Sequence, residues 1–233
     1  MPAYGKVFPK PHTFLAVIHV LNTDQAILNA RLARDHGANG VFLIDHGARS
    51  PQRLWEISHA VQFACSEFWV GLNFLGISPT DAILKLPTNI SGLWHDNAGI
   101  DEAEDFPAYE ASATWRARKA RRDWKGLYFG GVAFKGQEPV QNLGTVARAA
   151  VPYMDVVTTS GDATGKAPSI EKIQMMRLAI GTSPLAIASG MTPENVGPYL
   201  EYANCFLVAT GIGKSFHQLD AKRVKAFARA IGN

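Results

Sequence analysis

The sequence predicts a (β/α)₈ barrel, the TIM barrel of the α/β class, and three observations support this prediction. Short apolar runs of strand length alternate with longer segments whose apolar residues recur at helical spacing. Eight such runs in 233 residues leave about 29 residues for each strand–helix unit, close to what this fold uses. The runs are almost continuously apolar, which is typical of parallel strands covered by helices. A doubly wound open sheet is the competing architecture, but it more often has five or six strands.

The expected strands are the apolar runs that lie between glycine, proline and polar residues. Their expected bounds are 13–20, 40–44, 68–72, 91–94, 127–132, 155–158, 185–188 and 205–209. No linker, low-complexity segment or change of composition interrupts this alternation. We therefore expect a single TIM-barrel domain over residues 1–233.

Helices are expected between the strands because the apolar spacing there changes to about 3.6 residues. Three apolar stripes show this spacing: Leu54, Ile57, Val61 and Ala64; Ile170, Ile173, Met176 and Ile180; and Val224, Phe227, Ala228 and Ile231. Ser78-Pro79 and Thr192-Pro193 are typical helix starts, since a hydroxyl caps free N–H groups and proline suits the first helical position. We expect a short helix over 79–86 and a longer one over 109–124.

The composition excludes several classes of protein. Hydrophobic residues make up 47% of the chain and charged residues 18%, which excludes general disorder. No run of 18 apolar residues and no apolar leader within residues 1–12 is present, so we expect a cytoplasmic protein without membrane contact. Cys65 and Cys205 stand 140 positions apart and are expected to be core residues, because this spacing suits neither a disulfide framework nor a metal pair.

Basic residues are concentrated in one segment. They are Arg116, Arg118, Lys119, Arg121 and Arg122, between Trp115 and Trp124. The formal net charge is only +3, so a nucleic-acid partner would require such a concentration. At helical spacing, however, these cations spread around the helix axis. We expect a solvated or ion-paired face, and a nucleic-acid patch is the less favoured alternative.

Polar and ionisable residues recur after successive expected strands. In this fold, active sites form at the carboxyl ends of the strands, where the following loops converge. The candidate acid–base residues there are Asp45, His46, Asp96 and Lys135, followed by Asp162 after the sixth strand. Carboxylates, imidazoles and amines have tunable pKa values and therefore suit proton transfer. The alternative for each residue is a hydrogen bond that caps a loop.

The loops after the last three expected strands are rich in glycines and hydroxyls. Their candidate ligand-binding residues are Thr159, Ser160, Gly161, Thr164 and Lys166; Ser189, Gly190 and Met191; and Thr210, Gly211 and Lys214. Barrels often hold a phosphate between the loops after strands 7 and 8, at the N-terminus of a short extra helix. Residues 215–220 leave room for such a helix. We therefore predict a phosphorylated small molecule as the ligand.

Two motifs in this region carry a family resemblance. Residues 159–165 with Pro168, and residues 188–196, resemble the BtpA family of predicted TIM barrels. The loop after the seventh strand is also similar to that of phosphoribosylanthranilate isomerase, whose barrel binds the substrate phosphate there. The likeness is strongest over residues 154–214. It implies a phosphate-binding barrel, while the reaction of the family is poorly defined.

Two classes of function follow from these observations. The favoured class is an enzyme that acts on a small phosphorylated metabolite, such as a phosphosugar or phosphoribosyl compound, as an isomerase, lyase or phosphoribosyl-type transferase. The alternative is a non-catalytic assembly or regulatory protein that retains an anion pocket. No cofactor is required, although His19, Asp45, His46, His95 and Asp96 are candidate ligands for a divalent metal, without a metal-binding spacing. A homo-oligomer is one of two alternatives, because Trp55, Phe63 and Trp69 either form a subunit contact or pack in the core.

Overall fold

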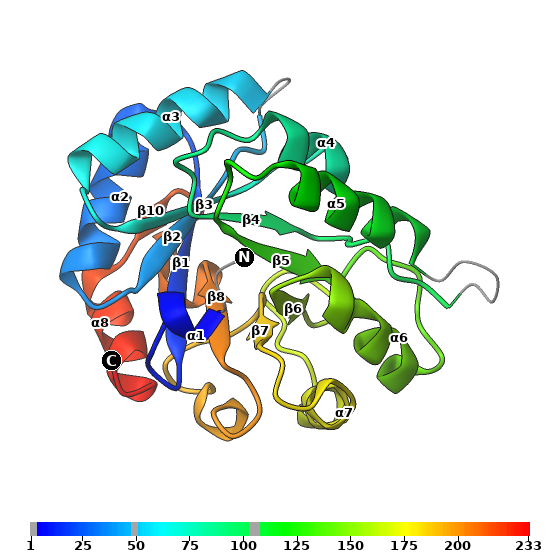
Figure 1. Ribbon diagram of the computed structural model, residues 1–233. Coiled ribbons are helices and arrows are strands. Elements are labelled where there is room, and N and C mark those ends of the chain that lie inside the picture. The colour runs from blue at the N-terminus through cyan, green and yellow to red at the C-terminus, as the bar shows by residue number, and fades with distance from the viewer. Residues whose placement is uncertain (1–3, 48–50, 103–107) are drawn as a thin grey trace.

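The protein forms a closed barrel of eight parallel strands (Figure 1). The computed structural model describes residues 4–47, 51–102 and 108–233. The strands are β1 (Thr13–His19), β2 (Gly40–Ile44), β3 (Trp69–Asn73), β4 (Gly92–His95), β5 (Leu127–Gly131), β6 (Val156–Thr159), β7 (Leu185–Ile187) and β8 (Cys205–Val208). Because β8 pairs in parallel with β1, the TIM-barrel prediction is confirmed and the open sheet is excluded.

Helices surround the barrel (Figure 1). They are α2 (Thr23–Asp35), α3 (Pro51–Ala64), α4 (Pro79–Lys85), α5 (Tyr109–Ala120), α6 (Leu143–Ala150), α7 (Ile170–Ile180) and α8 (Ala221–Ala230). A short helix, α1 (Tyr4–Val7), lies at the amino-terminal end of the barrel, where the Tyr4 hydroxyl donates to Thr13 Oγ1 over 2.7 Å. Among the described residues, no helix is both long and apolar enough to cross a bilayer.

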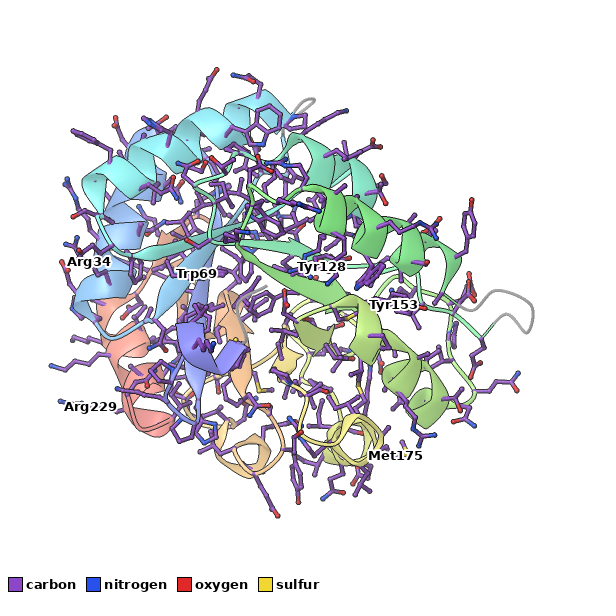
Figure 2. The ribbon with its side chains drawn as sticks, in the orientation of Figure 1. Arg34, Trp69, Tyr128, Tyr153, Met175 and Arg229 are labelled. Atoms are coloured by element: carbon purple, nitrogen blue, oxygen red, sulfur yellow. The ribbon has the colours of Figure 1, made fainter. Side chains whose placement is uncertain are left out.

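The strands bury both of their faces, which explains why their sequences are almost continuously apolar. In β2, Val41 and Leu43 point outward to the core beneath the helices, whereas Phe42 and Ile44 point into the barrel. Inside the barrel, Phe42 meets Trp69 edge to face at 5.0 Å between ring centroids. Figure 2 shows Trp69 among the interior side chains, with Arg34 and Arg229 at the outer surface. Both cysteines are buried and free, as expected.

The segment after β7 differs from the expected helix. Thr192 accepts backbone hydrogen bonds from Asn195 and Val196 in a turn, and only a 3₁₀ helix, η2 (Gly197–Tyr199), follows. A helix that began at Pro193 would place Pro198 in its interior, where proline has no N–H and clashes with the carbonyl four residues earlier. The helix prediction for this segment is therefore wrong.

The segment after β8 also differs from the prediction. Residues 210–212 form a 3₁₀ turn, η3 (Thr210–Ile212), and the expected short helix over 215–220 is replaced by an antiparallel hairpin of β9 (Gly213–Ser215) and β10 (Gln218–Leu219). Two side chains of α2 hold its tip, because Gln25 Nε2 and Asn29 Nδ2 donate to the His217 carbonyl over 2.6 and 2.8 Å. These long-range hydrogen bonds stabilise the hairpin.

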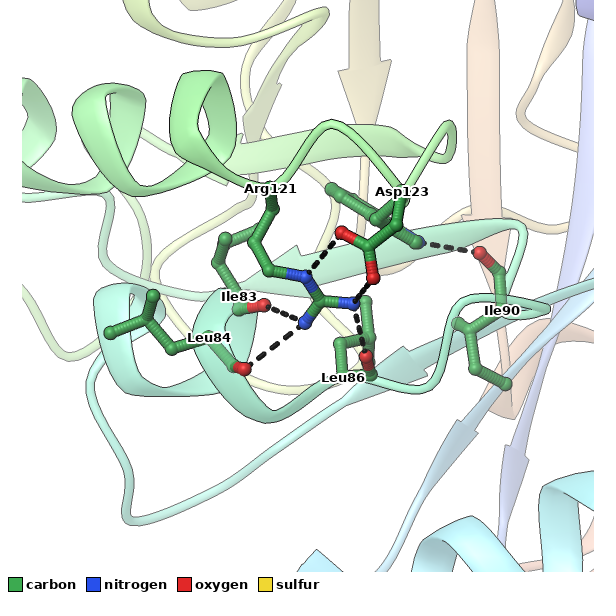
Figure 3. Close-up of polar contacts among 7 residues, drawn as sticks. Ile83, Leu84, Leu86, Ile90, Arg121 and Asp123 are labelled. Carbon is green, nitrogen blue, oxygen red and sulfur yellow. Dashed lines mark hydrogen bonds and ion pairs between the residues drawn. The ribbon is translucent and has the colours of Figure 1, made fainter.

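Two of the five clustered cations bind other parts of the fold. Arg118 is buried, forms an ion pair with Asp155 and lies over the rings of Trp124 and Tyr128. Arg121 follows the end of α5, which stops at Ala120 rather than at the expected residue 124. Its guanidinium donates hydrogen bonds to the carbonyls of Ile83, Leu84 and Leu86 (Figure 3). These bonds supply partners for carbonyl groups at the end of α4, where a helix leaves its last carbonyls unpaired. These two arginines therefore stabilise the fold and leave fewer cations for a nucleic-acid surface.

Candidate functional site

A cavity of about 140 Å³ lies at the carboxyl end of the barrel. The strands deliver four ionisable side chains to it: His19 at the end of β1, His46 after β2, Asp96 after β4 and Lys135 after β5. Three loops supply its other polar groups, Thr164 and Gly165, Ser189 to Met191, and Thr210. Apolar residues such as Val17, Ile44 and Trp94 form its floor. The expected convergence of these loops is thus observed at one cavity.

The candidate residues divide into two groups. Those that line the cavity are His46, Asp96, Lys135, Thr164, Ser189, Gly190, Met191 and Thr210. Those that do not line it are Asp45, Thr159, Ser160, Gly161, Asp162, Lys166, Gly211 and Lys214. Most of the second group hold the loops in place, as their contacts show.

Asp45 is a structural partner of α3. Its buried carboxylate accepts hydrogen bonds from Arg53 and from the Gly47 backbone, the latter over 2.9 Å. Arg53 also donates to the Leu21 carbonyl over 2.6 Å and so joins the loops after β1 and β2. These bonds engage both oxygens of Asp45, which does not line the cavity.

The hydroxyls at the end of β6 join the loops after β5 and β6. Thr159 Oγ1 donates to the Ala133 carbonyl over 3.2 Å, and Ser160 Oγ accepts from the Lys135 amide over 2.8 Å. Lys172, which the sequence analysis missed, donates to the Ala133 and Ser160 carbonyls over 2.6 and 2.7 Å. Burial lowers the pKa of Lys172, and nearby Asp162 opposes this shift. A lysine in the first turn of a helix carries no sequence signal for such a role.

The loops after β7 and β8 are in direct contact. Gly211 is buried so closely against the Met191 carbonyl that a Cβ at this position would lie 1.9 Å from its oxygen. Arg223 of α8 fixes this arrangement, because its Nε donates to the Gly211 carbonyl over 2.7 Å and its Nη2 to Glu194 over 3.1 Å. Asn195 Nδ2 donates to the Gly190 carbonyl over 2.8 Å. The two loops are therefore held together by side chains that do not line the cavity.

Four backbone N–H groups of these two loops have no hydrogen-bond partner among the described residues. They belong to Gly190, Met191, Thr210 and Gly211. Nearly all buried backbone donors in proteins are paired with protein, water or ligand. Met191 and Gly211 are buried, and Gly190, Met191 and Thr210 line the cavity. Unpaired N–H groups in the wall of a cavity suit an anion.

His19 and His46 form a hydrogen-bonded pair of imidazoles. His19 Nδ1 lies 2.9 Å from His46 Nε2, and the ring of Phe216 stacks on His19 at 4.2 Å. Burial, with the charges of His46, His217 and Lys135, lowers the pKa of His19 to about 4. Burial also lowers the pKa of His46, although Asp45 and Asp96 oppose this shift. At neutral pH the pair is therefore uncharged and able to accept a proton. The sequence analysis named His19 among the candidate metal ligands and not among the acid–base residues.

Asp96 and Lys135 complete the ionisable lining. Asp96 Oδ1 accepts from Asn73 Nδ2 over 2.9 Å, and Lys135 Nζ donates to Thr164 Oγ1 over 3.3 Å. Gln137 Nε2 donates to Asn97 Oδ1 over 2.9 Å and so ties the loop after β5 to the loop after β4. One carboxylate and one amine thus face the same cavity as the imidazole pair.

The five candidate metal ligands do not converge. Asp45 is bound to Arg53, and the two ring nitrogens of His95 contact the carbonyls of Ile77 and Asn97 at 2.9 and 2.7 Å. Within residues 4–47, 51–102 and 108–233, no three His, Cys, Asp or Glu side chains are grouped as a metal site requires.

The BtpA family model matches residues 129–233, the part of the chain from β5 onward. This finding confirms the resemblance that residues 159–168 and 188–196 predict. The photosystem I biogenesis protein BtpA of Synechocystis sp. is 32% identical over 80 residues, which are 33% of this chain and 28% of that relative. The chain therefore spans less than a third of the length of that curated relative.

Solved TIM-barrel structures resemble nearly the whole chain. The (S)-3-O-geranylgeranylglyceryl phosphate synthase of Thermoplasma acidophilum, in complex with its substrate sn-glycerol-1-phosphate, has a TM-score of 0.71, 10% identity and 99% coverage of both chains. The phosphoribosyl anthranilate isomerase of Thermus thermophilus has a TM-score of 0.62 and 16% identity over 94% of this chain and 97% of that one. At these identities the similarity establishes the shared fold.

Proposed function

Because residues 129–233 match the BtpA family and supply the amide-lined side of the cavity, we propose that this chain is an enzyme that binds a small phosphorylated metabolite. The phosphate lies against the free amides of Gly190, Met191 and Thr210, which line the cavity. The observation that carries the proposal is that these unpaired donors come from two loops in direct contact. Amides that are fixed before binding need little reorganisation to hold an anion.

The size of the cavity favours a small ligand. At about 30 Å³ for each water, 140 Å³ corresponds to roughly five waters, well below the pockets of about 300–1,000 Å³ that enclose drug-sized ligands. A phosphate and a short part of the metabolite fill this volume, and the remainder extends toward the exposed Leu75 and Phe216.

The ionisable lining supports acid–base chemistry on the enclosed part of the metabolite. Asp96 or the neutral His19–His46 pair accepts a proton, and Lys135 polarises an oxygen or returns the proton. Such steps belong to isomerases, lyases and phosphoribosyl-type transferases. The two solved structures described above, whose names include phosphorylated compounds, agree with this class of ligand.

A non-catalytic assembly or regulatory protein is the second candidate. The name of the matched relative, a photosystem I biogenesis protein, favours it. A binding protein needs the amides but not the acid–base residues, so the two functions differ in what Asp96 contributes.

Calorimetric titration with inorganic phosphate, followed by a turnover screen with phosphosugars and phosphoribosyl compounds, tests the proposal. We expect Asp96→Asn to retain phosphate binding and to lose about 100-fold or more in turnover, the usual share of a general acid or base. Asp24→Asn is the control, because it removes the same negative charge at an exposed position of α2. This variant is expected to retain both phosphate binding and turnover. Absence of phosphate binding would refute the ligand class, and binding without turnover would favour the second candidate.

A further inference from the structure

A second cavity of about 210 Å³ adjoins the first beneath the β9–β10 hairpin. We propose that it is a second anion subsite, so that the metabolite carries another anionic group in addition to its phosphate. Lys214, Ser215 and His217 of the hairpin line it, together with Thr210. This inference rests on the proposed function and specifies its substrate class.

The hairpin that forms this subsite is a rigid wall. The His217 carbonyl accepts hydrogen bonds from both Gln25 and Asn29 of α2. Asn29 is itself buried, and its Oδ1 accepts from the Leu219 amide over 3.1 Å. The backbone that carries Lys214 and Ser215 is therefore held in place before a ligand binds, which lowers the ordering cost of binding.

The second cavity is lined by several hydrogen-bond donors and, in the part of the chain that the structure describes, by no acidic side chain. Among the described residues, the Lys214 ammonium and the Ser215 and Thr210 hydroxyls have no hydrogen-bond partner, and none of the residues that line this cavity is Asp or Glu. Asp220 lies close enough to be affected by the charge of Lys214, but its carboxylate already accepts from the Lys222 and Arg223 amides. An unpaired ammonium beside hydroxyls suits a phosphate or carboxylate.

His217 of the hairpin is oriented by a hydrogen bond to the end of β1. Its Nδ1 lies 2.9 Å from the His19 carbonyl, which can only accept, so Nδ1 carries a proton. The His217 ring is therefore held in one orientation at the wall of the second cavity.

The two cavities share part of their lining. His19, Thr210 and Phe216 line both, and Thr210 and Phe216 are exposed, the latter by 51%. One ligand can therefore place its phosphate on the amides of the first cavity and a second anionic group beside Lys214. Compounds with two anionic ends, such as bisphosphates or phosphorylated carboxylates, fit this arrangement.

Titration with a matched ligand series tests the inference. The probes are propyl phosphate and the α,ω-bisphosphates of propane- to hexanediol, each at one fixed salt concentration. We expect at least one bisphosphate to bind about tenfold or more tightly than propyl phosphate, the factor that one charge-assisted hydrogen bond of about 1.4 kcal/mol supplies. Lys214→Gln is expected to remove this gain and to leave the affinity for propyl phosphate within about twofold.

Lys225→Gln provides the matched control, because Lys225 is an exposed lysine of α8 outside both cavities. This variant is expected to keep the gain. Equal binding of mono- and bisphosphates, or the same loss of gain in both variants, would overturn the second subsite alone. Failure of propyl phosphate to bind would overturn the proposed function and this inference with it.

Discussion

Replacement of Gly211 by alanine tests how the phosphate site is built. Gly211 is buried where the loops after β7 and β8 touch. An added Cβ would lie 1.9 Å from the Met191 carbonyl oxygen and 3.2 Å from Thr192 Cα. No flexible side chain can move aside, because both neighbours are backbone atoms of the opposite loop.

The size of the effect follows from this distance. Ordinary van der Waals contact begins near 3.4 Å, so the two loops must separate by about 1.5 Å. Overpacking of this kind costs about 1–3 kcal/mol in the free energy of unfolding. The separation also moves the Thr210 and Gly211 amides away from those of Gly190 and Met191, and loss of one or two charge-assisted hydrogen bonds weakens phosphate binding by about tenfold or more.

Two measurements separate these consequences. Urea denaturation gives the free energy of unfolding, and calorimetric titration of the folded variant with inorganic phosphate gives the affinity. Gly197→Ala is the control, since an added Cβ there meets no atom within 4 Å, and it is expected to keep the affinity. If folded Gly211→Ala binds phosphate as tightly as the parent protein, the two loops do not form the anion site together.

Two further predictions concern stability. Asp155→Asn leaves the buried Arg118 without its counterion and is expected to lower the free energy of unfolding by about 3–5 kcal/mol. Asp35→Asn, which breaks an exposed pair with Arg34, is the control and is expected to cost at most about 1 kcal/mol. Equal urea midpoints for the two variants would contradict this reasoning. The pKa of His19 is about 4 in the folded protein against 6.5 when unfolded, so the unfolded chain binds more protons between these values and stability falls as pH falls from 6.5 to 4. The shift corresponds to about 3 kcal/mol, which partial exposure reduces to roughly 1–2 kcal/mol. In His19→Gln, the free energy of unfolding measured between pH 6.5 and 4 is expected to fall by this amount less than in the parent protein. The same dependence on pH in both proteins would show that His19 does not titrate as described.

Most of the fold could be predicted from local sequence patterns. Barrel strands are buried on both faces, so runs such as 40–44 are apolar throughout, and helices buried on one face keep stripes such as Ile173, Met176 and Ile180. The same patterns predicted which ends of the strands would meet, and therefore that His46, Asp96 and Lys135 would share a cavity with Gly190 and Thr210. Burial periodicity and chain direction are local properties, which is why the sequence carries them.

The partner of each side chain depended instead on contacts between distant segments. Asp45 and Asp96 both follow a barrel strand, but Arg53 binds the first, whereas the second lines the cavity. The same applies to residues 215–220, where Gln25 and Asn29, nearly 200 positions away, hold a hairpin in place of the expected helix. The pairing of His19 with His46 likewise exists only because β1 and β2 are neighbours in the closed barrel. Residue type and spacing reveal which groups are available for chemistry, but each group's partner is set by which loops the closed barrel brings into contact.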